Sequence, residues 1–160
     1  FIGLGVDYLS GTDGTKAVTA DSRSNLFDPL YGTPHKFWGG MDYFYVASGF
    51  GNQGLMNYFL KAKYNAKDNL IFFAELHGFE SANKVSNGAG GTRTSYLGTE
   101  LDLKMSYNFT KMINIEAGYS YMKATNTMAS AQVKNVSNAN LSPQWAYVSL
   151  NIKPDFLEKK

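Results

Sequence analysis

An all-β fold of about six antiparallel strands is predicted by three features of the sequence. Apolar and polar residues alternate along several stretches, and alternate residues of a strand point to opposite faces of a sheet. Aromatic residues make up 15% of the 160 residues, and 16 glycines accompany few helix-forming runs. No apolar run reaches the roughly 18 residues that a transmembrane helix needs. These features favour strands over helices.

The clearest alternation lies within residues 96–122 and predicts a β-hairpin that turns at residues 110–112. Each arm is at least as long as the ~9–11 tilted residues that cross a bilayer as a strand. One face is polar and charged, and the other is apolar with aromatic residues towards its ends, which is typical of a lipid-facing band with aromatic girdles. The apolar set is Leu97, Thr99, Leu101, Leu103, Met105, Tyr107, Phe109, Ile113, Ile115, Ala117, Tyr119 and Tyr121.

Four further stretches alternate in the same way and are expected to be strands: residues 1–10, 54–64, 70–79 and 144–153. Within these stretches and the hairpin, every charge falls on the polar face. A Lys or Arg on the lipid side of a membrane barrel would cost roughly 2–4 kcal/mol at the bilayer midplane, which accounts for this exclusion. A soluble barrel or sandwich also alternates, with its apolar face turned towards a core, so it remains an alternative.

The connections alternate between long and short, which favours the membrane alternative. Long connections are expected at residues 11–53, 80–94 and 123–143, and short turns at residues 65–69 and 110–112. Outer-membrane barrels have long extracellular loops and short periplasmic turns, so this order places the C-terminus in the periplasm. The chain is then a single domain, residues 1–160, of an antiparallel transmembrane β-barrel. Residues 11–53 form its long, aromatic-rich extracellular loop region.

The polar face is expected to line a water-filled lumen. A centre at Lys111 places Lys104 diagonal to Glu116 and Asn108 opposite Asn114, and a centre at Lys67 places Lys61 diagonal to Glu75. The expected pore-lining residues are Asp7, Lys61, Lys63, Glu75, His77, Glu100, Asp102, Lys104, Glu116, Tyr147, Asn151 and Lys153. The aromatic loop is expected to fold inward and constrict the mouth through Arg23, Tyr31, His35, Lys36 and Trp38.

Other kinds of function find little support in the sequence. There is no cysteine, and the two histidines are too few for a zinc site, so we expect no metal and no cofactor. The net charge of +2 gives no reason to expect nucleic acid as a partner. Glu100 and Asp102 lie two residues apart on one face, which suits a catalytic pair but suits a solvated pore wall better. With no nucleophile and base together, we expect no enzyme.

The first strand and the long loop resemble a known family. Residues 5–11 (GVDYLSG), 27–37 (FDPLYGTPHKF) and 40–42 (GMD) resemble the alginate-export family of outer-membrane barrels, in a form typical of Bacteroidetes-like bacteria. The resemblance implies a monomeric barrel of about 18 strands that passes an anionic polysaccharide through a basic lumen. This chain would supply the C-terminal part of such a barrel, since six strands are fewer than the about eight that close one. Its polar face is mixed in sign rather than basic.

A passive outer-membrane channel for small polar solutes or an anionic polysaccharide is the function expected from these observations. Membrane lipid and lipopolysaccharide would contact its outer surface, in a Gram-negative cell envelope. Two alternatives stay open: a barrel that serves as a scaffold or subunit of a larger envelope complex without transport, and a soluble ligand-binding β-barrel.

Overall fold

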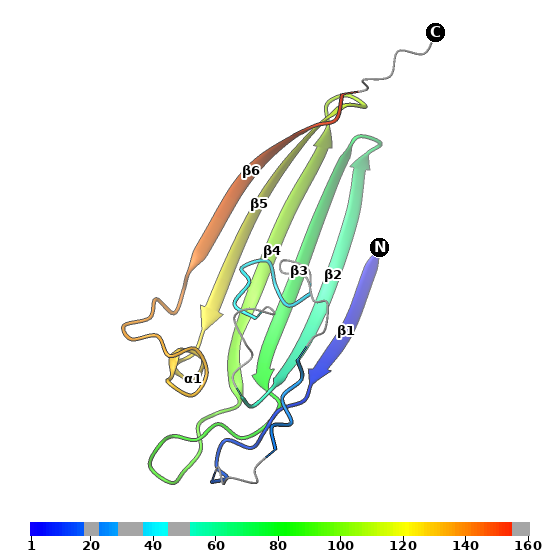
Figure 1. Ribbon diagram of the computed structural model, residues 1–160. Helices are drawn as coiled ribbons and strands as arrows, with labels where there is room; N and C mark the ends of the chain where they lie inside the picture. The colour runs from blue at the N-terminus through cyan, green and yellow to red at the C-terminus, as the bar shows by residue number, and fades with distance from the viewer. Residues whose placement is uncertain (18–22, 29–36, 45–51, 155–160) are drawn as a thin grey trace.

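Six antiparallel strands form one open sheet in the computed structural model, which describes residues 1–17, 23–28, 37–44 and 52–154. The strands pair in chain order from β1 to β6, so the sheet has two open edges (Figure 1). The predicted all-β, antiparallel fold is therefore confirmed. The strands are β1 (Ile2–Leu9), β2 (Leu55–Lys67), β3 (Leu70–Ser81), β4 (Tyr96–Asn108), β5 (Ile113–Ala124) and β6 (Gln144–Ile152).

The register runs unbroken across the middle of the sheet and separates its two faces. One row pairs Leu4 with Leu60, then Leu76, Leu101 and Tyr121. The next row, on the opposite face, contains Lys61, Glu75, Asp102, Ser120 and Trp145. We call the first side the apolar face and the second the polar face. Because side chains alternate, a slip of one residue in any strand would exchange its two sides.

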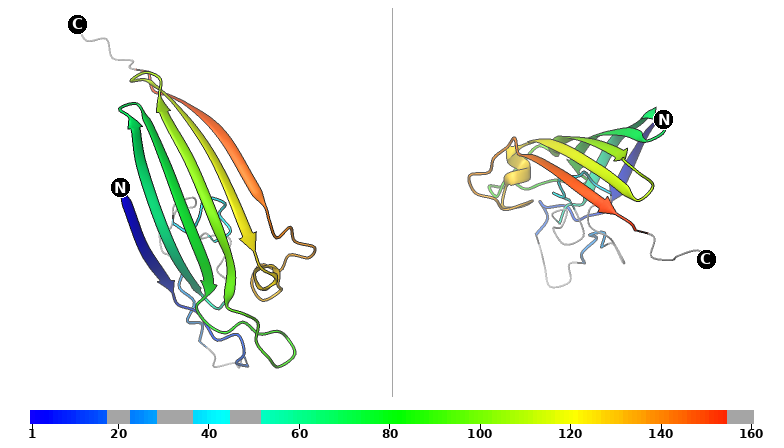
Figure 2. Two further views of the ribbon diagram at one scale, coloured as in Figure 1. Left: turned by 180° about the vertical axis from the view of Figure 1, so that it is seen from behind. Right: turned by 90° about the horizontal axis from the view of Figure 1, so that it is seen from above.

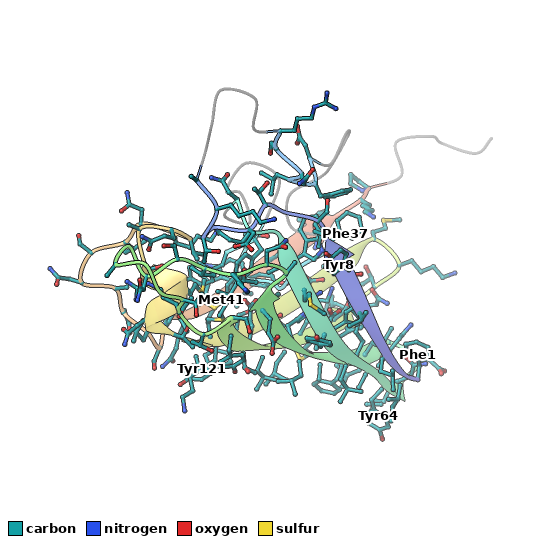
Figure 3. The ribbon with its side chains drawn as sticks, turned by 90° about the horizontal axis from the view of Figure 1, so that it is seen from below. Phe1, Tyr8, Phe37, Met41, Tyr64 and Tyr121 are labelled. Atoms are coloured by element: carbon teal, nitrogen blue, oxygen red, sulfur yellow. The ribbon has the colours of Figure 1, made fainter. Side chains whose placement is uncertain are left out.

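The apolar face lies open, whereas the loops pack on the other side. Leu4 is 85% exposed, Val148 77% and Tyr64 67%, and most other large apolar-face residues are partly exposed. In the right view of Figure 2, the blue and cyan segments between β1 and β2 lie on one side of the sheet. In Figure 3, Tyr64 and Tyr121 project from the sheet on the side opposite the loop residues Phe37 and Met41. A contiguous exposed apolar face of this kind is typical of surfaces that contact another protein or a membrane.

Strands β2, β3 and β5 extend further than the sequence indicated, and the added residues of β3 and β5 include one charge each. Glu80 of β3 pairs with Met56, and Lys123 of β5 pairs with Thr99, so both lie on the apolar side. The expectation that all strand charges share one face is therefore wrong at these positions. Each is the second-last residue of its strand, next to a long loop. The middle of the apolar face remains uncharged.

The short turn between β2 and β3 is tighter than expected. The strand continues to Lys67, so that Asp68 and Asn69 alone make the turn, and the register shifts between Asn65 and Lys67. Such a bulge adds one residue to one strand. As a result Lys61 lies directly opposite Glu75, and the diagonal pairing predicted for them is wrong.

The hairpin of β4 and β5 has the predicted register. Asn108 lies opposite Asn114, and Lys104, opposite Gly118, is diagonal to Glu116. Thr110 closes the turn, because its Oγ1 accepts hydrogen bonds from the backbone N–H groups of Met112 (3.1 Å) and Ile113 (3.0 Å). The sequence prediction is confirmed for this turn and for both diagonal and direct pairs.

Leu97 departs from the alternation that the sequence suggested. The register shifts where Phe79 pairs with Gly98 but Glu80 pairs with Tyr96, which leaves Leu97 as the extra residue. Its side chain is fully buried in a cluster with Phe79 and Met122 instead of joining the apolar face. Gly98 permits the bulge, since a Cβ there would come within 2.6 Å of the Met122 Cε atom.

A small core fills the loop end of the polar face. Strand residues, loop residues and the helix α1 (Asn126–Ala129) all contribute to it. The sequence predicted a polar loop at residues 123–143, but Thr125 caps one turn of helix there and Met128 packs inward. No helix in the described part of the chain is both long and apolar enough to cross a membrane. The core comprises Leu9, Trp38, Phe44, Leu55, Phe79, Leu97, Met122 and Met128.

We predict that Phe79→Ala lowers the free energy of unfolding by about 3–5 kcal/mol, because it leaves a cavity in a fully buried cluster. Urea titration of the purified protein measures this change. Val136→Ala, at a half-exposed loop position, serves as the control and should change it by no more than about 0.5 kcal/mol. Equal effects of the two substitutions would show that this core does not stabilise the sheet.

Candidate functional site

Residues 37–44 fold onto the polar face and are held there by strand β4. The backbone N–H of Met41 donates a hydrogen bond to Glu100 Oε1 (2.8 Å), and that of Gly40 donates to Asp102 Oδ2 (3.1 Å). Trp38 and Phe44 are buried. The expectation that the aromatic loop packs against the protein is thus confirmed for this segment, which we call the strap.

Two adjacent glycines allow the strap to come this close. Gly39 has φ +88°, and a Cβ on it would lie 2.6 Å from Glu100 Oε1. A Cβ on Gly40 would lie 2.7 Å from Asp102 Oδ1. The first position combines a left-handed backbone with a steric limit, so only glycine fits it without movement.

The end of the strap is packed from two sides. The Phe44 ring lies 4.7 Å from the Phe79 ring, measured between centroids, and the Lys134 ammonium lies 4.9 Å from the Phe44 centroid. Burial lowers the pKa of Lys134 to about 8. Burial also raises the pKa of Tyr43, and the Glu100 carboxylate adds to this rise. The strap, strand β3 and the loop that contains Lys134 therefore meet in one contact that is largely shielded from water.

Glu100 and His77 were expected to line an open pore, but the structure buries both. Glu100 has no exposed surface and His77 has 1%. Among the described residues, Glu100 Oε2 has no hydrogen-bond partner, although Oε1 holds the strap. The interpretation of Glu100 as part of a solvated wall is therefore wrong, because the strap covers it. Asp102 beside it keeps 16% of its side chain exposed.

His77 connects a row of polar side chains that crosses the sheet from β1 to β3. Its Nδ1 lies 2.9 Å from Asn57 Oδ1, and Asn57 Nδ2 donates to Asp7 Oδ2 (3.0 Å). Its Nε2 lies 3.4 Å from Glu75 Oε2, which also accepts from Lys61 Nζ at 2.7 Å. Asn57 and His77 are buried and find their partners within this row, whereas Asp7, Lys61 and Glu75 at its ends are partly exposed.

Beyond the strap the polar face stays accessible. Lys104 Nζ lies 3.9 Å from Glu116 Oε2 and 4.8 Å from the Phe73 ring centroid, and Tyr147 donates its hydroxyl to Glu116 Oε1 (2.5 Å). Lys63 Nζ also approaches the Phe73 ring, at 5.7 Å from its centroid. Further towards the turns, Asn114 donates to Asn108 and accepts from Asn151, and Lys153 follows directly after β6. This surface mixes both signs of charge.

A groove of about 400 Å³ separates the strap from this accessible wall. Its lining includes Phe37 and Gly40 from the strap, and Asp102, Trp145 and Tyr147 from the strands. No role was predicted from the sequence for Phe37, Gly39, Gly40 or Trp145. Two successive glycines inside an aromatic stretch were the signal that a backbone approaches another group closely there.

The predicted constriction residues have separate places. Trp38 is buried in the core, where it cannot narrow a channel, and Arg23 is exposed. Tyr31, His35 and Lys36 lie outside the described residues. Within the described chain, no three His, Asp or Glu side chains converge as a metal site requires.

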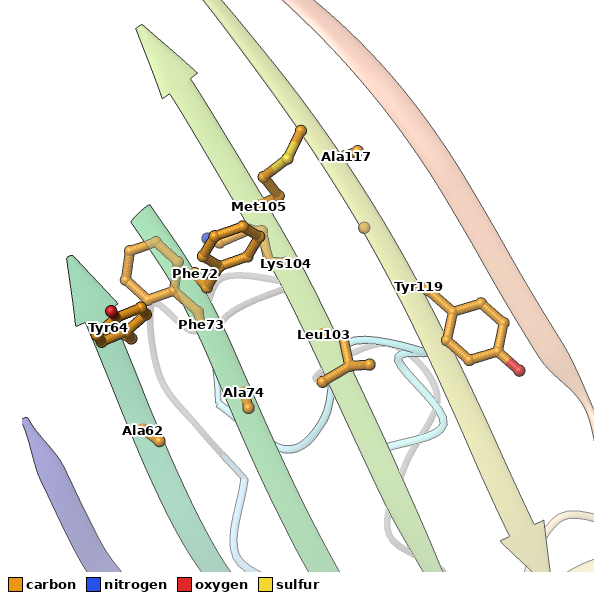
Figure 4. Close-up of a pocket in the computed structure, with 11 residues that line it drawn as sticks. Ala62, Tyr64, Phe72, Phe73, Ala74, Leu103, Lys104, Met105, Ala117 and Tyr119 are labelled. Atoms are coloured by element: carbon orange, nitrogen blue, oxygen red, sulfur yellow. The ribbon is translucent and has the colours of Figure 1, made fainter. Parts of the chain in front are cut away.

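A second hollow, of about 450 Å³, lies on the apolar face (Figure 4). Three alanines line it, Ala62, Ala74 and Ala117, beside the larger Tyr64 and Phe72. The hollow is shallow, and it arises because small and large side chains lie next to one another on four neighbouring strands. The described loops contribute no residue to its lining.

Comparison of the chain with protein-family models, with curated proteins and with solved structures gave no match. Function is therefore inferred from the geometry of the sheet and strap.

We predict that Gly39→Ala detaches the strap, because the left-handed backbone costs a residue with a Cβ roughly 1–2 kcal/mol and the methyl group would meet Glu100. Hydrogen exchange followed by mass spectrometry should then show at least about tenfold faster exchange in residues 37–44.

The matched control is Gly90→Ala. Gly90 has nearly the same backbone angle, φ +81°, but a Cβ added there would have no atom within 4 Å. It should leave strap exchange unchanged. Slow exchange in Gly39→Ala would contradict the proposed role of the close approach to Glu100.

Proposed function

We propose that the chain forms part of an outer-membrane β-barrel that acts as a passive channel for polar solutes. The polar face would line the lumen, the apolar face would contact lipid and lipopolysaccharide, and the strap would narrow the passage. Further strands, from the same protein or from other copies, would pair with the open edges of β1 and β6 to close the barrel.

The observation that carries this proposal is that the aromatic strap lies on the charged face while the apolar face stays uncovered. In a soluble barrel the apolar face would be the interior, and a loop with buried Trp38 and Phe44 would serve better there than on the charged side. In a membrane barrel the same strap would lie inside the lumen, where polar residues and water are found. The position of the strap on the charged face therefore supports a membrane barrel over a soluble one.

The relief of the apolar face also suits lipid. The hollow between Ala62, Ala74 and Ala117 offers an acyl chain a place against large neighbours such as Phe72. The strand charges on this side lie at strand ends, where a membrane surface would be: Glu80 and Lys123 at the loop end, and Lys67, opposite Leu70, at the turn end. Lipid-facing charge costs least near the interface, about 0–1 kcal/mol for Lys.

The resemblance to the alginate-export family enters as support for a polysaccharide or polar-solute channel. Selectivity would come from the charged wall and from the strap. Since Lys61 pairs with Glu75 and Lys104 lies beside Glu116, the wall is balanced rather than basic.

Fractionation and planar-bilayer recording test the proposal. We expect the protein in the outer-membrane fraction, soluble only in detergent, with a band that shifts on heating and a steady single-channel conductance. A folded, heat-shifting protein without conductance would favour the scaffold alternative. Recovery from the aqueous fraction without detergent would favour the soluble barrel and overturn the proposal.

We predict that Lys104→Glu makes the channel more selective for cations, by several-fold in the permeability ratio, because it reverses a charge on the accessible wall. The reversal potential in a salt gradient near 0.1 M, where the Debye length is about 10 Å, measures the ratio. Lys111→Glu, in the exposed turn, should leave it close to the wild-type value. The same shift in both variants would mean that Lys104 does not line the passage.

A further inference from the structure

The groove between strap and wall has the size and composition of a small-molecule site. Its volume of about 400 Å³ lies within the roughly 300–1,000 Å³ of ligand pockets. Aromatic side chains line it from both sides, Phe37 on the strap and Trp145 and Tyr147 on β6. Polar groups converge between them, as is usual for sites that orient a ligand.

The aromatic residues of β6 form a flat platform. Trp145 and Tyr147 are stacked, with ring centroids 4.8 Å apart and planes at 28°. Tyr147 lies directly over Gly118, since a Cβ on that glycine would come within 2.1 Å of the ring. The platform thus rests on the sheet backbone. Trp145 is 47% exposed and Phe37 46%, so these apolar surfaces are available to a ligand.

Hydrogen-bonding groups next to the platform are fixed in place and only partly used. Asp102 accepts from Ser120 Oγ (2.5 Å) and from the Gly40 N–H (3.1 Å). Glu116 accepts from the Tyr147 hydroxyl and lies beside Lys104. A carboxylate has about four acceptor positions, so both carboxylates can accept further hydrogen bonds, and Lys104 can donate.

The charges decide which ligand class fits. The lining contains three carboxylates, Glu75, Asp102 and Glu116, and one ammonium, Lys104. Lys61 neutralises Glu75 at 2.7 Å. Lys104 likewise lies beside Glu116, which leaves Asp102 as the one carboxylate of the lining without a cation partner in the described chain. This remaining negative charge would repel an anionic sugar, whereas a neutral sugar could donate hydroxyl hydrogen bonds to it. Aromatic faces also suit the apolar C–H faces of a sugar ring, while hydroxyl groups suit the carboxylates.

We propose that this groove is a binding subsite for a neutral, polyhydroxylated saccharide, which stacks on Trp145 and Tyr147 and donates hydroxyl hydrogen bonds to Asp102 and Glu116. The inference rests on the proposed channel and names its substrate class. It differs from the anionic polysaccharide that the family resemblance implies.

Titration calorimetry of the detergent-purified protein tests the subsite, with maltohexaose and cellohexaose as neutral probes and hexagalacturonate as the acidic probe. We expect at least one neutral probe to bind, and to bind more tightly than the acidic probe. Trp145→Ala should weaken this binding about tenfold or more, and Trp145→Tyr should recover most of it. Tyr147→Phe, which keeps the ring, should weaken it only a few-fold.

Val148→Ala is the control, because Val148 lies on the same strand but on the apolar face, and it should bind as the wild type does. Three results would each overturn the subsite. The acidic probe could bind more tightly than the neutral probes, Trp145→Ala could leave the binding of the neutral probes intact, or neither neutral probe could bind. Binding does not depend on conductance, so the two proposals fail separately. A conducting protein that binds no neutral probe would refute only the subsite, and a binding protein without conductance would refute only the channel.

Discussion

The two-residue period of the strand is the constraint on which this structure depends. It gives six paired strands one apolar and one polar side, and a continuous register keeps those sides in line from β1 to β6. A slip of one residue in β4 would bring Asp102 and Lys104 to the apolar side, so register and charge placement support each other. The two bulges occur at strand ends, near Lys67 and Leu97, where a change of face affects few residues.

The strap covers one part of the polar face and leaves the rest of that face accessible. Its backbone N–H groups donate hydrogen bonds to Glu100 and Asp102, while Trp38 and Phe44 supply the apolar contact. The same two carboxylates thus have different surroundings: Glu100 is sealed, and Asp102 remains at the edge of the groove. Packing, rather than sequence spacing, separates their roles.

Most of the sheet could be predicted because alternation is a local property. The hairpin register, the strand positions and the pairing of Asn108 with Asn114 all follow from residues close together in the chain. The burial of Glu100 and His77 could not be predicted in this way, since it depends on a loop that returns from far along the sequence. The position of Leu97 was missed for a related reason. A bulge inserts one residue into the strand and so changes the face of the residues beyond it, but the composition of the strand does not show where the bulge lies. The two adjacent glycines, Gly39 and Gly40, can be recognised in the sequence, but the carboxylates that they approach cannot.

The span between the strap and its anchor has a consequence for how the chain folds. Met41 and Glu100 are 59 residues apart, whereas β2 with β3, and β4 with β5, pair across short turns. Closing a long loop costs entropy before any contact compensates for it, so local hairpins form earlier. The strap can dock only once β4 presents its carboxylates. The hairpin of β4 and β5 would therefore form while Glu100 is still open to water, and this carboxylate would lose its water only in the later step in which the strap docks.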